Sequence, residues 1–389
     1  MKILYSHRTK SADGQYLHIK ALTHALREGG HEVEIDSPDG ASADADRLLD
    51  AAAGARAIRR IIPAPLHEAL ERAYSIASYP KLEMHARKFR PDIVYERYSL
   101  FYRAGIGLAR ARAIPLLLEV NAPLAAERAK YGGLAFPASA AKNEAHIWRS
   151  ADRILPVTRT LARLVEDAGV PAEKITIVGN AVDSAFTAQH DARNIRQRYA
   201  IGDAIIFGFA GFVRDWHRLD MVIGYLAARR DRNLRLLIVG DGDACAALRA
   251  MAREHGVSEK LVITGVIQRD EAPAHVASFD IALQPAATPY SSPLKLVEYL
   301  AAGRAIVAPR MENIIETIGD EQAALLFKPD DQASFAAALD ALIESEDLRD
   351  QYGEAARSAF SKHGRLWSDN ARLVEEIAME ERTRYQQRP

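Results

Sequence analysis

The sequence feature that most constrains the fold is an alternation of short apolar runs with helical patterns that restarts halfway along the chain. The first series contains the runs "KILYSH", "HEVEI", "PDIVYER", "IPLLLEVN" and "ADRILPVT". After "EKITIVGNAVD" a second series contains "AIIFGFAG", "LRLLIVGDG", "LVITGVI", "DIALQP" and "RAIVAP". Strands that alternate with helices are typical of parallel α/β sheets. The restart predicts two such domains, as does a length of 389 residues, because single cores stop growing at about 250–300 residues.

The connection between the two domains is predicted between residues 179 and 194. We place the N-terminal domain at residues 1–185 and the C-terminal domain at residues 186–365. Residues 366–389 have the pattern of a polar amphipathic helix with no strand after it. This helix is therefore expected to pack on a domain that is already formed.

Composition limits the class of protein. Hydrophobic residues make up 48% and charged residues 26%, as in soluble globular proteins, and no apolar run is long enough to cross a bilayer. The N-terminal apolar run is far too short for a secretory signal, so we expect a cytosolic protein. The single cysteine, Cys245, excludes an intrachain disulfide and a zinc site built on several cysteines, and its expected role is to fill a core.

The first half of the chain is mildly basic, and much of this charge lies between Arg56 and Arg90. Apolar residues recur there at helical spacing among arginines and lysines. Such a segment could lie on an anionic membrane or near a phosphorylated lipid. The alternative is a solvated helix face.

The segment "SSPLKLVEYLAAGRAIVA", residues 291–308, has a pattern that favours phosphate binding. Ser292 is expected to cap a helix whose first residue is Pro293. The free N–H groups at such a start, just after a parallel strand, attract phosphate, and Lys295 adds a positive charge. Glu298, one turn later on the same face, suits the two hydroxyls of a ribose. The pattern thus predicts a nucleoside diphosphate site, and the alternative is an exposed ion pair between Lys295 and Glu298.

The segment "GDGDA", residues 240–244, imitates two other motifs. Asp241 and Asp243 imitate an Asp-x-Asp metal site, and Gly240 and Gly242 imitate half of a dinucleotide fingerprint. The third glycine of that fingerprint would fall at Cys245, so we predict no NAD site. We interpret the loop as part of the nucleotide pocket.

The order of these segments, above all the closing one, resembles the retaining glycosyltransferases of the GT-B fold, family 4, over nearly the whole chain. The resemblance implies an α/β architecture of two Rossmann-like domains that face a deep cleft, with the C-terminal helix crossing back to the N-terminal domain. It also implies an acceptor site in the N-terminal domain and a nucleotide-sugar site in the C-terminal domain. The implied activity is the transfer of a hexose, with retention and without a metal or another cofactor, to a saccharide or lipid-linked hydroxyl. No nucleic-acid partner is expected.

Most donor contacts implied by the resemblance lie in the C-terminal domain. Glu298 is assigned to the donor ribose, and Arg214, His217 and Lys295 are assigned as the catalytic groups that stabilise the departing diphosphate. His217 could instead pack at a helix start. The further donor contacts are Gly14, Arg218, Gly240, Asp241, Val266, Tyr290, Ser291, Ser292, Pro293 and Leu294. Because Tyr290 stands where most members carry a glutamate that contacts the donor sugar, the identity or orientation of that sugar is left open.

Residues of the first domain are assigned to the acceptor and the transferred sugar. Asn121 stands where the family often has a histidine that contacts the donor sugar, with Glu119 just before it. Glu119 could equally be a buried, paired carboxylate. Glu96 and Arg97 end a strand at the sheet edge where ligands collect, which makes them candidates for acceptor contact.

The segments "YSSPLK" and "EVNAPL" resemble those of members that build bacterial surface polysaccharides, often on lipid-linked acceptors. This would place the protein at the inner face of the membrane. Two other functions remain open: a GT-B sugar-nucleotide epimerase and a non-catalytic nucleotide-binding module. Acceptor-dependent release of free nucleoside diphosphate distinguishes a transferase from both.

Overall fold

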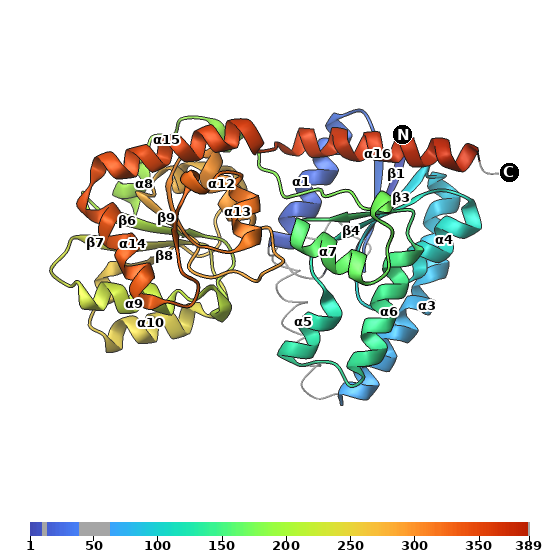
Figure 1. Ribbon diagram of the computed structural model, residues 1–389, viewed down its shortest axis with the longest axis horizontal. Coiled ribbons are helices and arrows are strands. Elements are labelled where there is room, and N and C mark those ends of the chain that lie inside the picture. Colours follow the sequence, from blue (N-terminus) through green and yellow to red (C-terminus); the bar gives the residue numbers. More distant parts are fainter. Residues whose placement is uncertain (10–13, 39–62, 388–389) are drawn as a thin grey trace. The chain divides into compact units, whose positions relative to one another are not determined.

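The computed structural model describes residues 1–9, 14–38 and 63–387. The chain divides into two compact units (Figure 1). Unit 1 comprises Met1–Gly179 and Trp367–Pro389, and unit 2 comprises Asn180–Leu366. The predicted boundaries were 185/186 and 365/366. The structure places the first boundary slightly earlier than predicted, between Gly179 and Asn180.

Unit 1 is built on a parallel sheet with the strand order β2-β1-β3-β4-β5. Its strands are β1 (Lys2–Ser6), β2 (Glu32–Asp36), β3 (Ile93–Arg97), β4 (Leu116–Val120) and β5 (Arg153–Pro156). Every residue of β3, β4 and β5 is buried, as expected of parallel strands with helices on both faces. The chain order reverses between β1 and β3, so a ligand is expected beyond the carboxyl ends of these strands.

Helices flank this sheet (Figure 1). They are α1 (Gly14–Glu28), α3 (Ala64–Phe89), α4 (Ala104–Arg112), α5 (Leu124–Tyr131), α6 (Pro137–Ser150), α7 (Arg159–Asp167) and α16 (Trp367–Gln386). The basic segment predicted between Arg56 and Arg90 thus forms α3 from Ala64 onward, and residues 56–62 lie outside the described residues.

The last helix, α16, belongs to unit 1 and packs along α1. Val374 and Ile377 are buried on its inner face. Arg153 at the start of β5 forms ion pairs with Glu380 and Glu381 of α16, both at 2.8 Å. Apolar burial and charge pairing therefore act together to dock this helix.

Unit 2 has a parallel sheet with the strand order β11-β10-β9-β6-β7-β8. Its strands are β6 (Ile205–Ala210), β7 (Leu234–Val239), β8 (Leu261–Ile263), β9 (Ile281–Leu283), β10 (Ala305–Pro309) and β11 (Leu325–Phe327). Here the chain order reverses between β6 and β9. A ligand is therefore expected beyond the carboxyl ends of β6 and β9.

The helices of unit 2 complete two cores, one on each side of its sheet. They are α8 (Arg193–Arg198), α9 (Asp220–Ala228), α10 (Cys245–Glu254), α11 (Ala272–Ala277), α12 (Leu294–Ala301), α13 (Glu312–Ile318), α14 (Gln332–Glu344) and α15 (Glu346–His363). Cys245 is buried in the second of these cores, as predicted. None of the helices in the described parts of the chain combines the length and the apolar character needed to cross a bilayer.

Candidate active site

Glycines shape the carboxyl edge of the sheet in unit 2. Gly211 follows β6 and Gly240 follows β7, and both have a positive φ, at 121° and 134°. A Cβ atom on Gly240 would lie 2.3 Å from the carbonyl oxygen of Gly211, and one on Gly242 would lie 2.1 Å from that of Val213. The two loops thus pack backbone against backbone, and side chains are excluded from their contact.

Lys295 and His217 meet at this edge. The Nζ atom of Lys295, in the first turn of α12, lies 3.5 Å from Nε2 of His217 and 4.7 Å from the ring centroid of Phe209. His217 ends a 3₁₀ turn, is buried, and packs against Phe209 and Trp216. The structure therefore brings together two of the three predicted catalytic residues, and His217 also packs at a turn, as its alternative interpretation proposed.

In their protonation states at neutral pH, Lys295 and His217 both present hydrogen-bond donors, and neither offers the other an acceptor. The Nδ1 atom of His217 accepts the backbone N–H of Arg214 at 3.1 Å. Burial, together with Lys295 and Arg214, lowers the pKa of His217 to about 2, so the ring is neutral and carries its proton on Nε2. Burial lowers the pKa of Lys295 to about 8, against the effect of Glu298, so the ammonium is still protonated at neutral pH. Two donors then face each other, an arrangement that an anionic oxygen between them would satisfy.

The start of α12 differs by one residue from the prediction. The helix begins at Leu294 with Pro293 as its N-cap, and no side chain caps its first N–H groups. Ser292 is therefore not the cap, and its carbonyl accepts from the Nδ2 atom of Asn180. Asn313 donates to the carbonyls of Thr288 and Ser291, at 2.9 and 2.7 Å, and so fixes the preceding loop. The helix start is thereby presented without a side chain over it.

Glu298 pairs with an arginine that sequence reasoning missed. Its Oε1 atom accepts from Nη1 of Arg269 at 2.8 Å, and the Arg269 guanidinium also bonds Asp183 at 2.8 Å. Glu298 is only 7% exposed, so Arg269 neutralises a largely buried carboxylate and fixes its orientation. The alternative of an exposed ion pair between Lys295 and Glu298 is not formed among the described residues.

The other predicted donor contacts have more varied surroundings. The Arg214 guanidinium stacks on Phe212, with 4.7 Å to the ring centroid, whereas Arg218 pairs with Asp220 at 3.0 Å. Asp241 accepts the N–H of Gly242 at 2.8 Å, which stabilises the glycine loop. Val266 is 71% exposed, and Tyr290 lies partly exposed in the turn before α12. Of these residues, Arg218 is already engaged by a neighbouring carboxylate.

In unit 1, Glu119 is a buried and paired carboxylate, the second of its two interpretations. Its oxygens bond Arg97, His18 at 3.1 Å, Tyr95 at 2.8 Å and Asn121 at 2.6 Å. Burial alone would raise the pKa of Glu119, but His18 and Arg97 hold it well below its usual range. The prediction that Glu119 contacts the acceptor is therefore not supported, because these groups surround the carboxylate. His18, which sequence reasoning missed, carries no motif and is recognised only by this contact.

Glu96 and Gly14 occupy different parts of unit 1. Glu96 is buried at the end of β3, where a Cβ atom on Gly105 of α4 would lie 2.0 Å from its Oε2 atom. Burial raises the pKa of Glu96 to about 8, against the effect of Arg8, so it is largely protonated at neutral pH. This argues for a packing role rather than for acceptor contact. Gly14 is the first residue of α1, directly after residues that are not described.

Two family models match the chain and together cover most of it. Residues 191–359 match the model described as glycosyl transferases group 1, and residues 12–186 match the one described as glycosyltransferase family 4. Among solved structures, HepE from Anabaena, in complex with UDP, aligns with a TM-score of 0.71 at 15% identity, over 97% of this chain and 100% of that chain. This likeness and the two parallel sheets confirm the predicted α/β fold of GT-B type.

Curated relatives match parts of the chain. The 2-deoxystreptamine glucosyltransferase of Streptomyces kanamyceticus is 27% identical over 194 residues, 48% of this chain and 49% of that protein. The D-inositol 3-phosphate glycosyltransferase of Acidothermus cellulolyticus is 24% identical over 294 residues, 72% of this chain and 64% of that protein. The chain thus spans about half to two thirds of the length of these relatives.

Proposed function

Because the chain belongs to the group 1 glycosyltransferases of family 4, we propose that it transfers a hexose from a nucleoside-diphosphate sugar to a saccharide hydroxyl, with retention at the anomeric carbon. The observation that carries this proposal is the pair of facing donors on Lys295 and His217, at 3.5 Å, beside the uncapped start of α12. A diphosphate oxygen placed between them would accept from both groups. The same oxygen would gain negative charge as the sugar departs.

Each residue then has a defined role in the proposed reaction. Lys295, neutral His217 and the first N–H groups of α12 stabilise the leaving diphosphate, where charge develops in the transition state. Arg214 lies beside them and adds positive charge, so the protein supplies the cations and we propose no metal. Glu298, oriented by Arg269, accepts from the ribose hydroxyls of the donor. We propose no protein nucleophile: the acceptor hydroxyl attacks on the face that the diphosphate leaves, and the diphosphate takes its proton.

The first test is a thermal-shift panel of UDP, GDP, ADP and their sugar conjugates. HepE was solved with UDP, which makes UDP the first ligand to try. One nucleotide should raise the melting temperature of the wild type, and Glu298→Ala should clearly reduce this shift. Failure of every nucleotide at millimolar concentration would contradict the proposed donor site.

A second comparison tests the assigned role of Glu298. The 2′-deoxy form of the stabilising nucleotide lacks one ribose hydroxyl, so the wild type should bind it more weakly than the ribose form. Both Glu298→Ala and Arg269→Ala should bind the two forms equally, whereas inorganic pyrophosphate should bind all three proteins alike. A loss of pyrophosphate binding in Arg269→Ala would instead indicate general damage to the loop. Release of free diphosphate on addition of acceptor then separates a transferase from an epimerase or a binding module.

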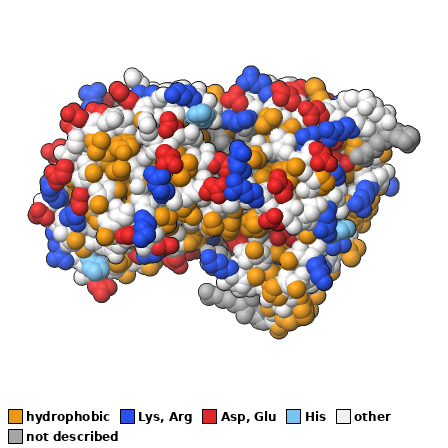
Figure 2. Space-filling model, in the orientation of Figure 1, with side chains coloured by type: hydrophobic (Ala, Val, Ile, Leu, Met, Phe, Trp, Pro, Cys, Tyr) orange, Lys and Arg blue, Asp and Glu red, His pale blue; other side chains and the backbone are white. Residues whose placement is uncertain are grey.

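We also propose that the acceptor is lipid-linked and that α3 contacts the membrane which carries it. Apolar side chains are exposed on this helix, with Ile76 78% and Leu70 51% exposed, and Phe136 is exposed before α6. Hydrophobic side chains gather where α3 and α6 begin, in the lowest part of unit 1 in Figure 2. Arg72 and Arg103 border a groove of about 590 Å³ beside Ile76; Arg72 is paired with Glu68 at 2.7 Å, whereas Arg103 bonds the neutral side chain of Asn143 and so supplies positive charge. Apolar and basic groups together are typical of a surface that binds anionic lipid.

Sedimentation with vesicles tests the membrane contact. The wild type should sediment with vesicles that contain anionic phospholipid, and the double variant Leu70→Ser, Ile76→Ser should remain largely in the supernatant. Met379→Ser is the matched control, because Met379 is 49% exposed on α16 and lies outside this surface. Equal sedimentation of the double variant and the control would contradict the proposed contact.

A further inference from the structure

A polar cavity lies at the amino edge of the sheet in unit 1, away from the strand ends that carry the candidate site. It has a volume of about 290 Å³. Its lining includes Leu116, the first residue of β4, and Asp152, just before β5. Arg97 and Asn121, by contrast, lie at the carboxyl ends of β3 and β4. The cavity is therefore distinct from the proposed transferase site.

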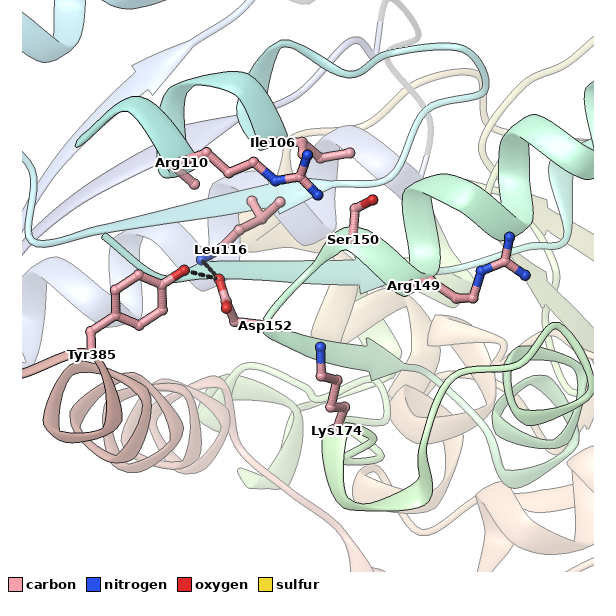
Figure 3. A pocket seen from close by; sticks show the side chains of 9 residues that line it. Ile106, Arg110, Leu116, Arg149, Ser150, Asp152, Lys174 and Tyr385 are labelled. Carbon is pink, nitrogen blue, oxygen red and sulfur yellow. Dashed lines mark hydrogen bonds between the residues drawn. The ribbon is translucent and has the colours of Figure 1, made fainter. Parts of the chain in front are cut away.

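Three cationic side chains from three different elements line this cavity. Arg110 comes from α4, Arg149 from α6 and Lys174 from the 3₁₀ turn at Ala172–Lys174. Figure 3 shows the cationic ends of Arg110 and Lys174 on opposite sides of Ser150 and Asp152, with the Arg149 guanidinium directed away from them. Two cations thus converge on one hydroxyl and one carboxylate.

The cavity lining contains one carboxylate, that of Asp152, against three cationic side chains. The Oδ2 atom of Asp152 accepts from the N–H of Leu116 at 2.9 Å and from the hydroxyl of Tyr385 at 2.8 Å. Lys174 donates to the carbonyl of Ala151 at 3.2 Å, which fixes its position but leaves its charge uncompensated. Within the described ranges, the Arg110 guanidinium has no hydrogen bond or ion pair.

The arginines near this cavity also affect a neighbouring histidine, His146. Burial together with Arg103, Arg110 and Arg149 lowers the pKa of His146, which precedes Arg149 on α6. The cavity thus combines three cationic side chains with one carboxylate, and its main donors to a ligand are Arg110 and Lys174.

We propose that this cavity binds a small anion that carries one or two phosphate groups, held by Arg110 and Lys174, because the hydroxyl of Ser150 already donates to the carbonyl of His146 at 2.8 Å. A guanidinium binds two phosphate oxygens at once, and an ammonium adds a point charge from the other side. The volume lies at the lower end of the range of about 300–1,000 Å³ for ligand sites, which fits a small phosphate compound. Tyr385 of α16 also borders the site, where its hydroxyl donates to Asp152.

Calorimetric titration with inorganic pyrophosphate tests the proposal on the full-length protein. The background variant Lys295→Ala weakens pyrophosphate binding at the proposed donor site, so the remaining binding reports on the cavity. In this background, Arg110→Ala and Lys174→Ala should each weaken binding by about tenfold or more, since hydrogen bonds to charged groups are strong. Lys142→Ala, which removes an exposed lysine of α6, is the matched control and should leave the affinity unchanged.

A second experiment separates a free anion from a lipid headgroup. Neutral vesicles doped with phosphatidic acid replace pyrophosphate, and the same variants are compared. Binding of pyrophosphate that depends on Arg110 identifies a soluble ligand, and Arg110-dependent binding of the vesicles alone identifies a headgroup. Retention of both activities in Arg110→Ala overturns the proposal. Because the test measures binding in a Lys295→Ala background, its outcome is independent of the transferase reaction.

Discussion

Burial lowers the pKa of Lys295, the residue proposed to bind the diphosphate. Its ammonium is half-buried beside the ring of Phe209, and the cost of this burial lowers its pKa to about 8. A lysine with this pKa is protonated at neutral pH but can lose its charge under mildly basic conditions. Neighbouring His217 stays neutral throughout this range. Lys295 is therefore the group of this cluster that titrates there.

The affinity for nucleoside diphosphate should consequently fall as the pH rises through about 8. The protonated form binds the diphosphate, so binding is fully present below this pKa and should weaken about fivefold between about pH 8 and pH 9. Calorimetric titration from neutral to basic pH measures this. Lys295→Arg should give a flat profile, because a guanidinium stays charged. A flat wild-type profile would show that the Lys295 ammonium does not contact the ligand.

Site residues that lie close together in the sequence are predicted better than site residues that meet only in the folded chain. Lys295 and Glu298 lie on one short helix, so their proximity follows from helix periodicity alone. Arg269 reaches Glu298 across a separation of 29 residues, and His18 reaches Glu119 across 101. Nothing local to Arg269 or His18 encodes these contacts, which depend on how several strands and helices pack together.

At the scale of elements, apolar runs bounded by turn residues predicted strands as short as β8 and β9, whereas β11, which is equally short, was not predicted. Helix ends were less predictable. The helix α12 begins one residue later than expected, at Leu294, and the residue before its cap is held by a contact with Asn180, distant in sequence. Local propensity thus decides that an element forms, and tertiary contacts decide where it ends.

Replacement by alanine should change the stability of the protein in opposite directions at two glycines of unit 2. A Cβ atom on Gly208 of β6 would lie 1.9 Å from the Cγ atom of buried Phe279, whereas one on Gly224 of α9 would meet only the end of the Gln332 side chain, at 3.6 Å. Gly208→Ala should therefore destabilise by about 1–3 kcal/mol through overpacking. Gly224→Ala should stabilise by about 0.5–1 kcal/mol, because alanine favours the helix. Urea unfolding measures both changes, and a shift of the same sign in both variants would contradict the packing described for β6.

At the scale of the whole molecule, the restarted alternation of strands and helices predicted two parallel sheets, but periodicity alone could not place the last helix. The amphipathic pattern of α16 shows only that it must cover something apolar. Its partner Arg153 lies 228 residues before Glu381 in the chain. The expectation that this helix returns to the N-terminal domain rested on the family resemblance rather than on any local signal.

Trp367, the first residue of α16, connects this helix to the interior of unit 1. It is 5% exposed and meets the ring of His18 edge-on, with centroids 4.9 Å apart, and His18 in turn bonds Glu119. Trp367→Ala should lower the free energy of unfolding by about 3–5 kcal/mol, because it removes a large buried side chain and leaves a cavity. Met379→Ala, on the exposed face of the same helix, should change it by no more than about 0.5 kcal/mol. If denaturant unfolding gave equal changes for the two variants, α16 would be attached to unit 1 only through its charged C-terminal half, where Arg153 and Asp152 bind it.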